Sequence, residues 1–450
     1  MITREFLSAM WTALGGPAEV IEKLDFANPG ELPSVFAVSD FAAAAVAAAG
    51  AATAELIGTR FGELPPVSVN LRLASLWYGW SIRPDGWTMP APWDPASGDY
   101  ATADGWIRLH TNAPHHREAA LRVLGVPADK ARVAKAVSVW NADELESAVV
   151  QSGGCAATMR SLEAWKQHPQ GRHVAAAPLL NVETSDDTYD LGWASTPERP
   201  LKGLRILDLT RVLAGPVATR FLAGLGADVL RIDSPTWDEP GVVPDVTLGK
   251  RCARLDLRSD QTQLRKLLSQ AHVLVHGYRA DALENLGLGS EERRRIRPGL
   301  VDVCLNAYGW GGPWRNRRGF DSLVQMSAGI ADTGMRERKK ERPTPLPVQA
   351  LDHATGYLMA AAVIRGLTGR KGFRAQASLA GTAQLLVSRR PTEPATNLIT
   401  ATTDADWSSE VELTEFGPAH RLLPPVQVGR SVMHWDRPAV SLGSSPPEFT

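Results

Sequence analysis

Two aspartates at the starts of apolar, alanine-rich helices are the residues best suited to chemistry in this sequence. Asp352 lies in the run PLPVQALDHATG, residues 345–356, and Asp40 lies in the similar run LPSVFAVSDFAA, residues 32–43. A carboxylate can act as a covalent nucleophile, and a helix N-terminus favours its ionised form. The same position also suits an aspartate that only caps its helix. The repeat therefore predicts reactive carboxylates, helix caps, or one of each.

The elements around Asp352 alternate between strands and helices. Strands are predicted at 204–209, 229–232, 273–276 and 300–305, and a helix opens at Gly215-Pro216, where proline suits the first turn. A strand–helix–strand unit of this length implies a parallel pair with a right-handed crossover. We therefore predict a Rossmann-like parallel α/β sheet that takes its ligands beyond the carboxyl ends of its strands.

A glycine pair follows the last of these strands. The loop at 308–313 reads YGWGGP, so Gly311 and Gly312 stand at a carboxyl end of the predicted sheet. Glycine lets the backbone come close to another group. Backbone N–H groups in such a loop can stabilise an oxyanion. We expect Gly311 and Gly312 to serve as these donors.

The first 200 residues follow a different, α+β pattern. A turn and strand are predicted at 104–109, with helices at 115–124 and 142–151. Proline and polar residues near 195–203 disfavour regular structure and mark a boundary. The recurrence of the aspartate helix on both sides of this boundary indicates duplication of a supersecondary unit.

Composition narrows the class of protein. The chain has 450 residues, 44% of them apolar, and a formal net charge of -1, which leaves no electrostatic footprint for nucleic acid. The alanine-rich helices expected near 41–57 and 357–367 are too short to span a bilayer. The three cysteines are far apart, which argues against a disulfide framework and against a metal site. The start lacks an apolar secretory segment. We expect a cytoplasmic protein without metal, membrane or nucleic-acid partner.

Six ordered motifs resemble the class III CoA-transferases of the CaiB/BaiF type, a family related to formyl-CoA transferase that also contains α-methylacyl-CoA racemases. They occupy residues 201–216, 225–233, 249–257, 283–288, 308–321 and 350–356. In the first half, the Asp40 segment and residues 104–107 and 162–171 resemble later parts of the same family.

The chain thus looks like two partial copies in an atypical arrangement. Residues 1–200 would hold the Asp40 helix segment (30–75) and a small α+β domain (about 95–195). Residues 201–450 would hold the βαβ region (201–330), the Asp352 segment (345–385) and an irregular tail (386–450). The family folds as intertwined rings, so the resemblance implies a large Rossmann-like domain, a smaller α+β domain and a homodimer.

The resemblance also implies an activity, that of a transferase of sulfur-containing groups. Such an enzyme moves CoA from an acyl-CoA to a carboxylic acid. Asp352 would attack the thioester to give a mixed anhydride, and the CoA thiolate would return to give an aspartyl-CoA thioester. Asp321 would be an accessory acid, with Gly311 and Gly312 at the oxyanion. CoA would be a substrate rather than a tightly bound cofactor. The residues expected to contact it are Arg211, Val212, Leu213, Leu255, Leu257 and Arg318.

Several departures keep other functions open. The family's racemases have a histidine where this chain has Phe320, which cannot move a proton, and two-base racemisation needs both partners. The glycine-rich closing loop of the family should fall at 90–98, which is not glycine-rich, so a catalytically inactive CoA-binding homologue is a further alternative. Asp40 has Ala44 where the pattern has glycine. An oxidoreductase that holds a ribose with Asp233 would need a GxGxxG turn, which is missing after the first strand.

Overall fold

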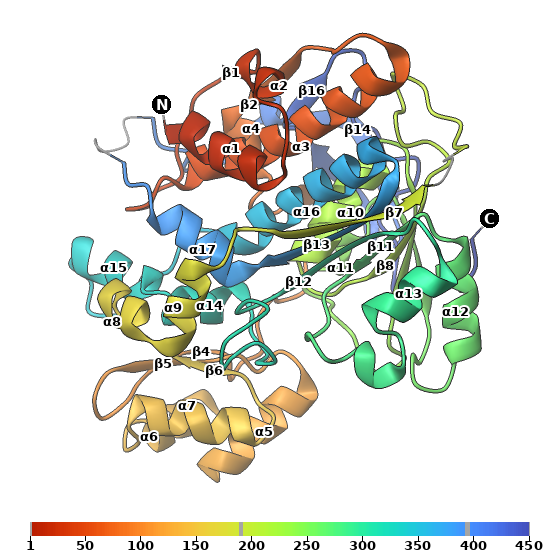
Figure 1. Cartoon of the computed structure of the whole chain (residues 1–450). Helices are drawn as coiled ribbons and strands as arrows, with labels where there is room; N and C mark the ends of the chain where they lie inside the picture. Colours follow the sequence, from red (N-terminus) through yellow and green to blue (C-terminus); the bar gives the residue numbers. More distant parts are fainter. Residues whose placement is uncertain (1, 189–191, 392–396, 450) are drawn as a thin grey trace.

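The computed structural model describes residues 2–188, 192–391 and 397–449. A seven-stranded sheet forms its centre, in the order β10-β9-β8-β11-β12-β13-β7 (Figure 1). The strands are β7 (Asn181–Thr188), β8 (Arg205–Leu209), β9 (Asp228–Asp233), β10 (Lys250–Arg254), β11 (Val273–His276), β12 (Val301–Asn306) and β13 (Lys371–Ser378).

Strands β8 to β13 are parallel, and only β7 runs antiparallel, at the edge beside β13. All residues of β11 and β12 are buried, as expected when helices cover both faces of a parallel sheet. Counted from β8, the parallel strands follow the order 3-2-1-4-5-6 of doubly wound α/β sheets. The order reverses between β8 and β11, so this edge is the expected ligand crevice. The predicted α/β class is confirmed.

Helices pack on both faces of this sheet. The larger hydrophobic core joins one face to the alanine-rich helices, and the smaller core joins the other face to the helix that precedes β11. The helices of the second half are α10 (Ala214–Gly224), α11 (Val243–Val246), α12 (Gln261–Gln270), α13 (Ser290–Ile296), α14 (Asp321–Ser327), α15 (Ile330–Glu337), α16 (Ala350–Gly369) and α17 (Leu379–Val387), with 3₁₀ turns η1 (Glu284–Leu286) and η2 (Asp404–Asp406).

The first half contains a helix–strand–helix unit that repeats the order of α16, β13 and α17. The residues before the two long helices have nearly the same backbone angles, φ -74° and ψ 60° at Ala37 against φ -76° and ψ 64° at Gln349. Each strand ends in a polar N-cap, Asn70 or Ser378, whose side chain accepts a backbone N–H of the next helix. The elements of this unit are α3 (Val38–Phe61), β2 (Val67–Asn70) and α4 (Leu71–Leu76).

Helix α3 is longer than the sequence pattern predicted. It has 24 residues, because the helical run extends past 41–57 at both ends, and it is long and apolar enough to cross a membrane by length and composition alone. However, 89% of its apolar window is buried inside the protein, where α3 packs against α16. The elements before it are α1 (Ile2–Ala13), α2 (Ala18–Glu22) and β1 (Asp25–Ala27).

A small three-stranded sheet and its helices form a separate layer at the bottom of Figure 1. Its own core includes Ile107, Val133 and Leu145, all fully buried. Its elements are β4 (Gly98–Ala101), β5 (Trp106–Leu109), α5 (Pro114–Leu124), α6 (Lys130–Val137), α7 (Ala142–Gln151) and β6 (Ala156–Thr158). Helices α8 (Leu162–Gln167) and α9 (Pro169–Ala176) lead from it to β7.

The prediction of an irregular tail over 386–450 is wrong for its central part. Strands β14 (Trp407–Thr414), β15 (Gly417–Leu422) and β16 (Val426–Val428) form there. Strand β15 pairs with β3 (Ile82–Pro84), and β16 pairs with β2. Strands β14 and β15 pair with each other as a hairpin, whereas β3 and β2 lie far away in the sequence, so local composition gave no sign of the pairings with them.

Candidate active site

Asp352 is the third residue of α16, and the carboxyl of Asp321 lies beside it. The backbone N–H of Asp352 donates to Oδ2 of Asp321 over 2.9 Å, while the side-chain amide of Gln325 donates to Oδ1. Gln325 is held in turn, because its Oε1 accepts the N–H of Leu346 over 2.7 Å. Asp321 therefore satisfies the start of α16 from a neighbouring helix. The structure brings the predicted nucleophile and the predicted accessory acid together.

Both carboxyls are buried, and their pKa values shift accordingly. Burial raises the pKa of Asp352 well above its usual range, and the charge of Asp321 raises it further. Burial also raises the pKa of Asp321 to about 6, against the opposing effect of hydrogen bonds from Gln325, Asp352 and Leu351. Two neighbouring buried carboxyls cannot both ionise easily, so the pair titrates as a unit.

This result corrects the expectation that the helix N-terminus keeps Asp352 ionised. The backbone N–H groups of Leu351 and Asp352 at the helix start are directed to Asp321. Within the described ranges, no group hydrogen-bonds to the Asp352 carboxyl, which is buried, with 8% of the residue exposed. The helix start therefore stabilises the charge of Asp321, and burial dominates at Asp352.

Gly356 fixes the position of Asp352 relative to the sheet. A Cβ atom at Gly356 would lie 2.4 Å from the carbonyl oxygen of Ala214 and 2.9 Å from the side chain of Val217. Only a glycine lets α16 cross α10 this closely. Because Gly356 lies about one turn after Asp352, the crossing places the carboxyl near the turn that joins β8 to α10.

That turn lies at the reversal point of the sheet and has an unusual backbone. Val212 has φ of 63°, a left-handed conformation that is strained for a β-branched residue and that often marks functional sites. Its N–H donates to both carboxylate oxygens of Glu239, over 3.0 and 2.9 Å. Arg211 lies over the rings of Trp237 and Tyr278, at 4.9 and 5.6 Å from their centres. Leu213, the N-cap residue of α10, is buried.

Arg318 and Arg211, from distant parts of the sequence, both act on His115. Burial lowers the pKa of His115, and the charges of Arg318 and Arg211 lower it further, which places both guanidinium groups around the start of α5. The ring centres of His115 and Trp237 are 5.8 Å apart. Arginine suits phosphate through bidentate hydrogen bonds.

The two leucines predicted to contact CoA pack in or against the smaller hydrophobic core. Leu255 is buried in the smaller hydrophobic core, and Leu257 packs against the same cluster. The backbone N–H of Leu255 is also engaged, since it donates to the carbonyl oxygen of Asp233 over 2.9 Å. Leu255 therefore has a packing role, because its side chain lies in the core and its N–H is hydrogen-bonded.

The predicted oxyanion loop, residues 308–313, packs against α9 and is hydrogen-bonded to it. A Cβ atom at Gly311 would lie 2.2 Å from Nε2 of His173, and one at Gly312 would lie 2.6 Å from Oε1 of Gln170. The Gln170 amide donates to the carbonyl oxygens of Tyr308 and Gly311, over 2.9 Å each. This close approach to α9 explains both glycines by packing.

His110 and Glu239 belong to the surroundings of the site and were missed by the sequence reasoning. The ring of His110 stacks on that of Phe320, with 3.7 Å between centres and 11° between planes. Neither residue lies in a recognisable motif, and each reaches the site through tertiary contacts. The N–H of Val212 donates to Glu239. The strained backbone of this turn also has no signature in the sequence.

Asp40 has different neighbours. The hydroxyl of Thr3 in α1 donates to its Oδ1. Its charge adds to the effect of burial in raising the pKa of Glu31. Asp40 is half-buried, and its position in α3 matches that of Asp352 in α16.

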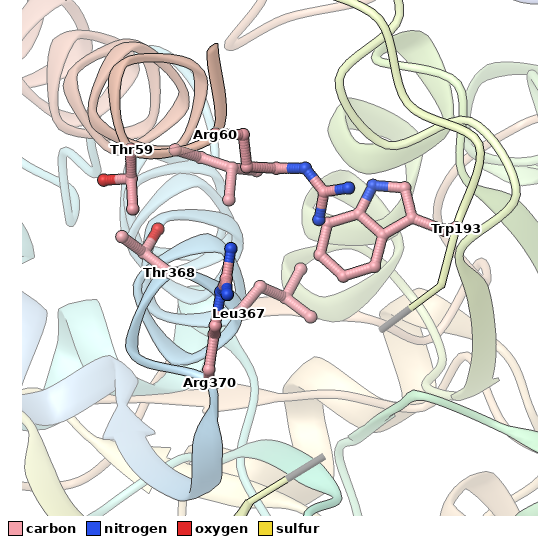
Figure 2. Close-up of a pocket in the computed structure, with 7 residues that line it drawn as sticks. Thr59, Arg60, Trp193, Leu367, Thr368 and Arg370 are labelled. Carbon is pink, nitrogen blue, oxygen red and sulfur yellow. The ribbon is translucent and has the colours of Figure 1, made fainter. Parts of the chain in front are cut away.

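A cavity of about 60 Å³ lies at the other end of the two long helices (Figure 2). The guanidinium of Arg60 faces the indole ring of Trp193 there, 4.1 Å from its centre. Helix α16 has 20 residues, so this cavity lies about 30 Å from its start and apart from Asp352. The lining residues are Leu56, Thr59, Arg60, Trp193, Leu367, Thr368 and Arg370.

In the parts of the chain that the structure describes, no group of three or more histidine, cysteine, aspartate or glutamate side chains could hold a metal ion.

Comparison with known proteins identifies the second half of the chain. Residues 201–406 match the family model of CoA-transferase family III. An acetyl-coenzyme A transferase of Hypoxylon pulicicidum is 30% identical over 60% of this chain and 50% of its own length. A probable fatty acyl-CoA transferase of Mycobacterium tuberculosis is 35% identical over 39% of this chain and 48% of its own length. The chain thus spans about half the length of the curated relatives that it matches.

Solved structures give a similar match over a part of the chain. A crystal structure of the Mycobacterium tuberculosis protein is 32% identical, with a TM-score of 0.40, over 42% of this chain and 56% of the other. The motifs that first suggested the family lie inside the matched region, together with Asp321 and Asp352. Residues 201–406 of this chain are therefore similar to CoA-transferase family III.

Proposed function

We propose that this protein moves CoA from an acyl-CoA to a carboxylic acid, with Asp352 as the carboxylate that carries first the acyl group and then CoA. The observation that carries this proposal is the buried pair of Asp352 and Asp321, held by Gly356 against the turn at the reversal point of the sheet. A strongly perturbed carboxyl pair in the ligand crevice of a doubly wound sheet is a candidate for covalent chemistry.

The shared proton decides when Asp352 can react. A carboxylate must be ionised to attack a thioester. When the pair holds one proton and Asp321 takes it, Asp352 carries the negative charge. Its oxygen then bonds to the thioester carbon, the C–S bond breaks, and the departing CoA thiolate leaves a mixed anhydride on Asp352. The thiolate returns to the aspartyl carbonyl and releases the acyl group as a carboxylate. The acceptor acid takes up CoA through the reverse steps.

The phosphates of CoA have a matching surface. Arg211 and Arg318, from two segments of the large domain, both lie within electrostatic reach of His115, where α5 begins without a side-chain cap. A helix N-terminus and two arginines together favour a phosphate group. The indole of Trp237, which lies between Arg211 and His115, adds a flat apolar surface.

The segment at 90–98 supports water exclusion although it is not glycine-rich. Trp93 contacts the ring of His110 edge-on, with 5.8 Å between ring centres. On the other side, a Cβ atom at Gly241 would lie 2.6 Å from Cα of Pro92. The segment therefore touches both the small domain and the large domain. A site closed in this way would protect an anhydride from hydrolysis.

The racemase alternative lacks a second proton-transfer group. Phe320 precedes Asp321, and His110, which stacks on Phe320, has a pKa lowered to about 3 by burial, so it is a weak base. A racemase needs both groups near neutral pH. The homodimer that the family resemblance implies is a further part of the proposal, and sedimentation analysis of the purified protein tests it.

The direct test is to trap the intermediate. The protein is incubated with an acyl-CoA, treated with hydroxylamine or borohydride, and digested for mass spectrometry. We expect a modified Asp352 and an unmodified Asp40. Exchange of deuterium into the α-carbon without any adduct would support a racemase. Bound CoA with neither adduct nor exchange would support an inactive CoA-binding homologue.

A further inference from the structure

The proposed reaction needs a hydrogen-bond donor that the sequence motifs do not supply. Attack on the thioester moves a pair of electrons onto the acyl carbonyl oxygen, and such oxyanions are stabilised by donors held in place beforehand. Gly311 and Gly312, which the sequence suggested for this role, are packed against His173 and Gln170 of α9. A donor elsewhere at the site would complete the reaction.

His110 is fixed in a single orientation beside the carboxyl pair. Its backbone N–H donates to the carbonyl oxygen of Cys155 over 2.9 Å, which anchors it at the end of β5. Its imidazole is stacked face to face on Phe320, and the edge-on ring of Trp93 meets it at 83°. Two aromatic neighbours therefore set the plane of the ring.

The position of His110 ties it to Asp321. Phe320, which the imidazole covers, is the residue directly before Asp321. The charge of Arg108 lowers the pKa of both His110 and Asp321, so both lie within its electrostatic reach. Asp321 in turn accepts the backbone N–H of Asp352. His110 thus contacts the residue next to Asp321 from the side of the small domain.

The hydrogen-bonding state of His110 is incomplete. The residue is 5% exposed, and its Nδ1 is buried without a partner among the described residues. Burial lowers the pKa of the imidazole to about 3, with Arg108 and His116 acting in the same direction, so the ring is neutral near pH 7 and carries one N–H. Nε2 is not among the buried atoms without a partner, and no hydrogen bond to it occurs within the described residues.

The proton of the neutral ring belongs on Nε2. A buried donor without a partner costs about 1–3 kcal/mol, and Nδ1 offers a proton no acceptor. Placing the proton on Nε2 leaves a donor on the nitrogen that a ligand can reach. A neutral imidazole of this kind is known to polarise a carbonyl group in other enzymes.

We propose that Nε2–H of His110 donates a hydrogen bond to the acyl carbonyl oxygen of the bound thioester. This inference rests on the proposed function. As Asp352 forms its C–O bond, the carbonyl π electrons move to the oxygen that His110 contacts. When they return, the C–S bond breaks and CoA leaves as a thiolate. His110 keeps its proton throughout and acts by position alone.

Two substitutions distinguish a donor from a packing group. H110F keeps an aromatic ring against Phe320 but removes the N–H, whereas H110Q loses the stack but can place an amide N–H near the position of Nε2. We expect H110F to slow formation of the Asp352 adduct in a single turnover by about 10²-fold, as loss of one oxyanion donor does. H110Q should be slowed less, and the CoA dissociation constant should change little in either variant.

The order of the two variants decides the outcome. Faster adduct formation in H110F than in H110Q would overturn the proposal, because it would assign His110 a packing role. So would a wild-type rate in both. His434, with 66% of its side chain exposed, provides the control variant H434Q. Failure of the proposed function would look different, since the wild-type protein would then form no Asp352 adduct at all.

Discussion

Asp352 and Asp40 occupy the same local structure and face different surroundings. Each is the third residue of a long, alanine-rich helix, after a residue with nearly the same backbone angles. Asp352 meets a second carboxyl and a close helix crossing, whereas Asp40 meets a hydroxyl from α1. The start of a helix is common to both. The proton affinity of Asp352 is therefore set by its burial and by the neighbouring Asp321, and not by its own helix alone.

The largest expected effect comes from removing each carboxylate in turn. D352N should lower the rate of CoA transfer by on the order of 10⁴-fold or more, because a nucleophile has no substitute in covalent catalysis. D40N, the matched control, should stay within about twofold of the wild-type rate, since Asp40 hydrogen-bonds to Thr3 away from the crevice. Steady-state transfer from an acyl-CoA to an acid measures both. Equal losses in the two variants would mean that the chain has two working sites.

The next effect concerns the charge of Asp321. D321N keeps an acceptor for the N–H of Asp352 but removes the negative charge, so the pKa of Asp352 should fall. The acidic limb of the pH–rate profile should then move to lower pH by roughly one unit or more. An unmoved limb would show that the two carboxyls do not share a proton.

The same variant should change how stability depends on pH. Burial raises the pKa of Asp321 from 3.8 to about 6 in the folded protein, so folding favours its protonated form. This contribution is fully present below about pH 4 and is lost as the pH rises through about 6. The loss is on the order of 3 kcal/mol of unfolding free energy. Denaturation of the wild type at pH 4.5 and 7 should show it, and D321N should show less of it.

A smaller effect separates the two helix crossings. G356A places a Cβ against the carbonyl oxygen of Ala214, so we expect a loss of about 1–3 kcal/mol of unfolding free energy and a displaced Asp352. A44G, at the matching position of α3, should cost about 1 kcal/mol through helix propensity alone. Urea denaturation measures both losses, and trapping of the Asp352 adduct reports the displacement. A larger loss in A44G would contradict the role given to the crossing at Gly356.

The sheet was predictable because its signals are local. Residues 273–276 form β11 as predicted, and the strands at 204–209 and 229–232 differ from β8 and β9 by a residue or so at their ends. Apolar runs between glycine and proline are enough to place buried parallel strands. The tail failed for the opposite reason, because β15 and β16 also pair with β3 and β2, which lie far away in the sequence.

The candidate site was predictable where a motif carried it. Asp352, Asp321 and the two arginines come from family motifs; the structure brings the two carboxyls together and puts both arginines within electrostatic reach of His115. His110 and Glu239 could not be found in this way, because both depend on the approach of distant segments. The protonation of Asp352 was also beyond the sequence, since it depends on burial and on the neighbouring charge.

Strand β7 makes the two halves inseparable as folding units. The sequence boundary near residue 200 lies between β7 and β8, yet β7 hydrogen-bonds to β13 and closes that edge of the large sheet. A fragment beginning at residue 201 would expose the backbone of β13, and bare strand edges recruit other chains and aggregate. Cleavage at the boundary would therefore yield two fragments that fold stably only when they associate with each other. The join between the two halves behaves as a covalent tether rather than as a hinge between domains.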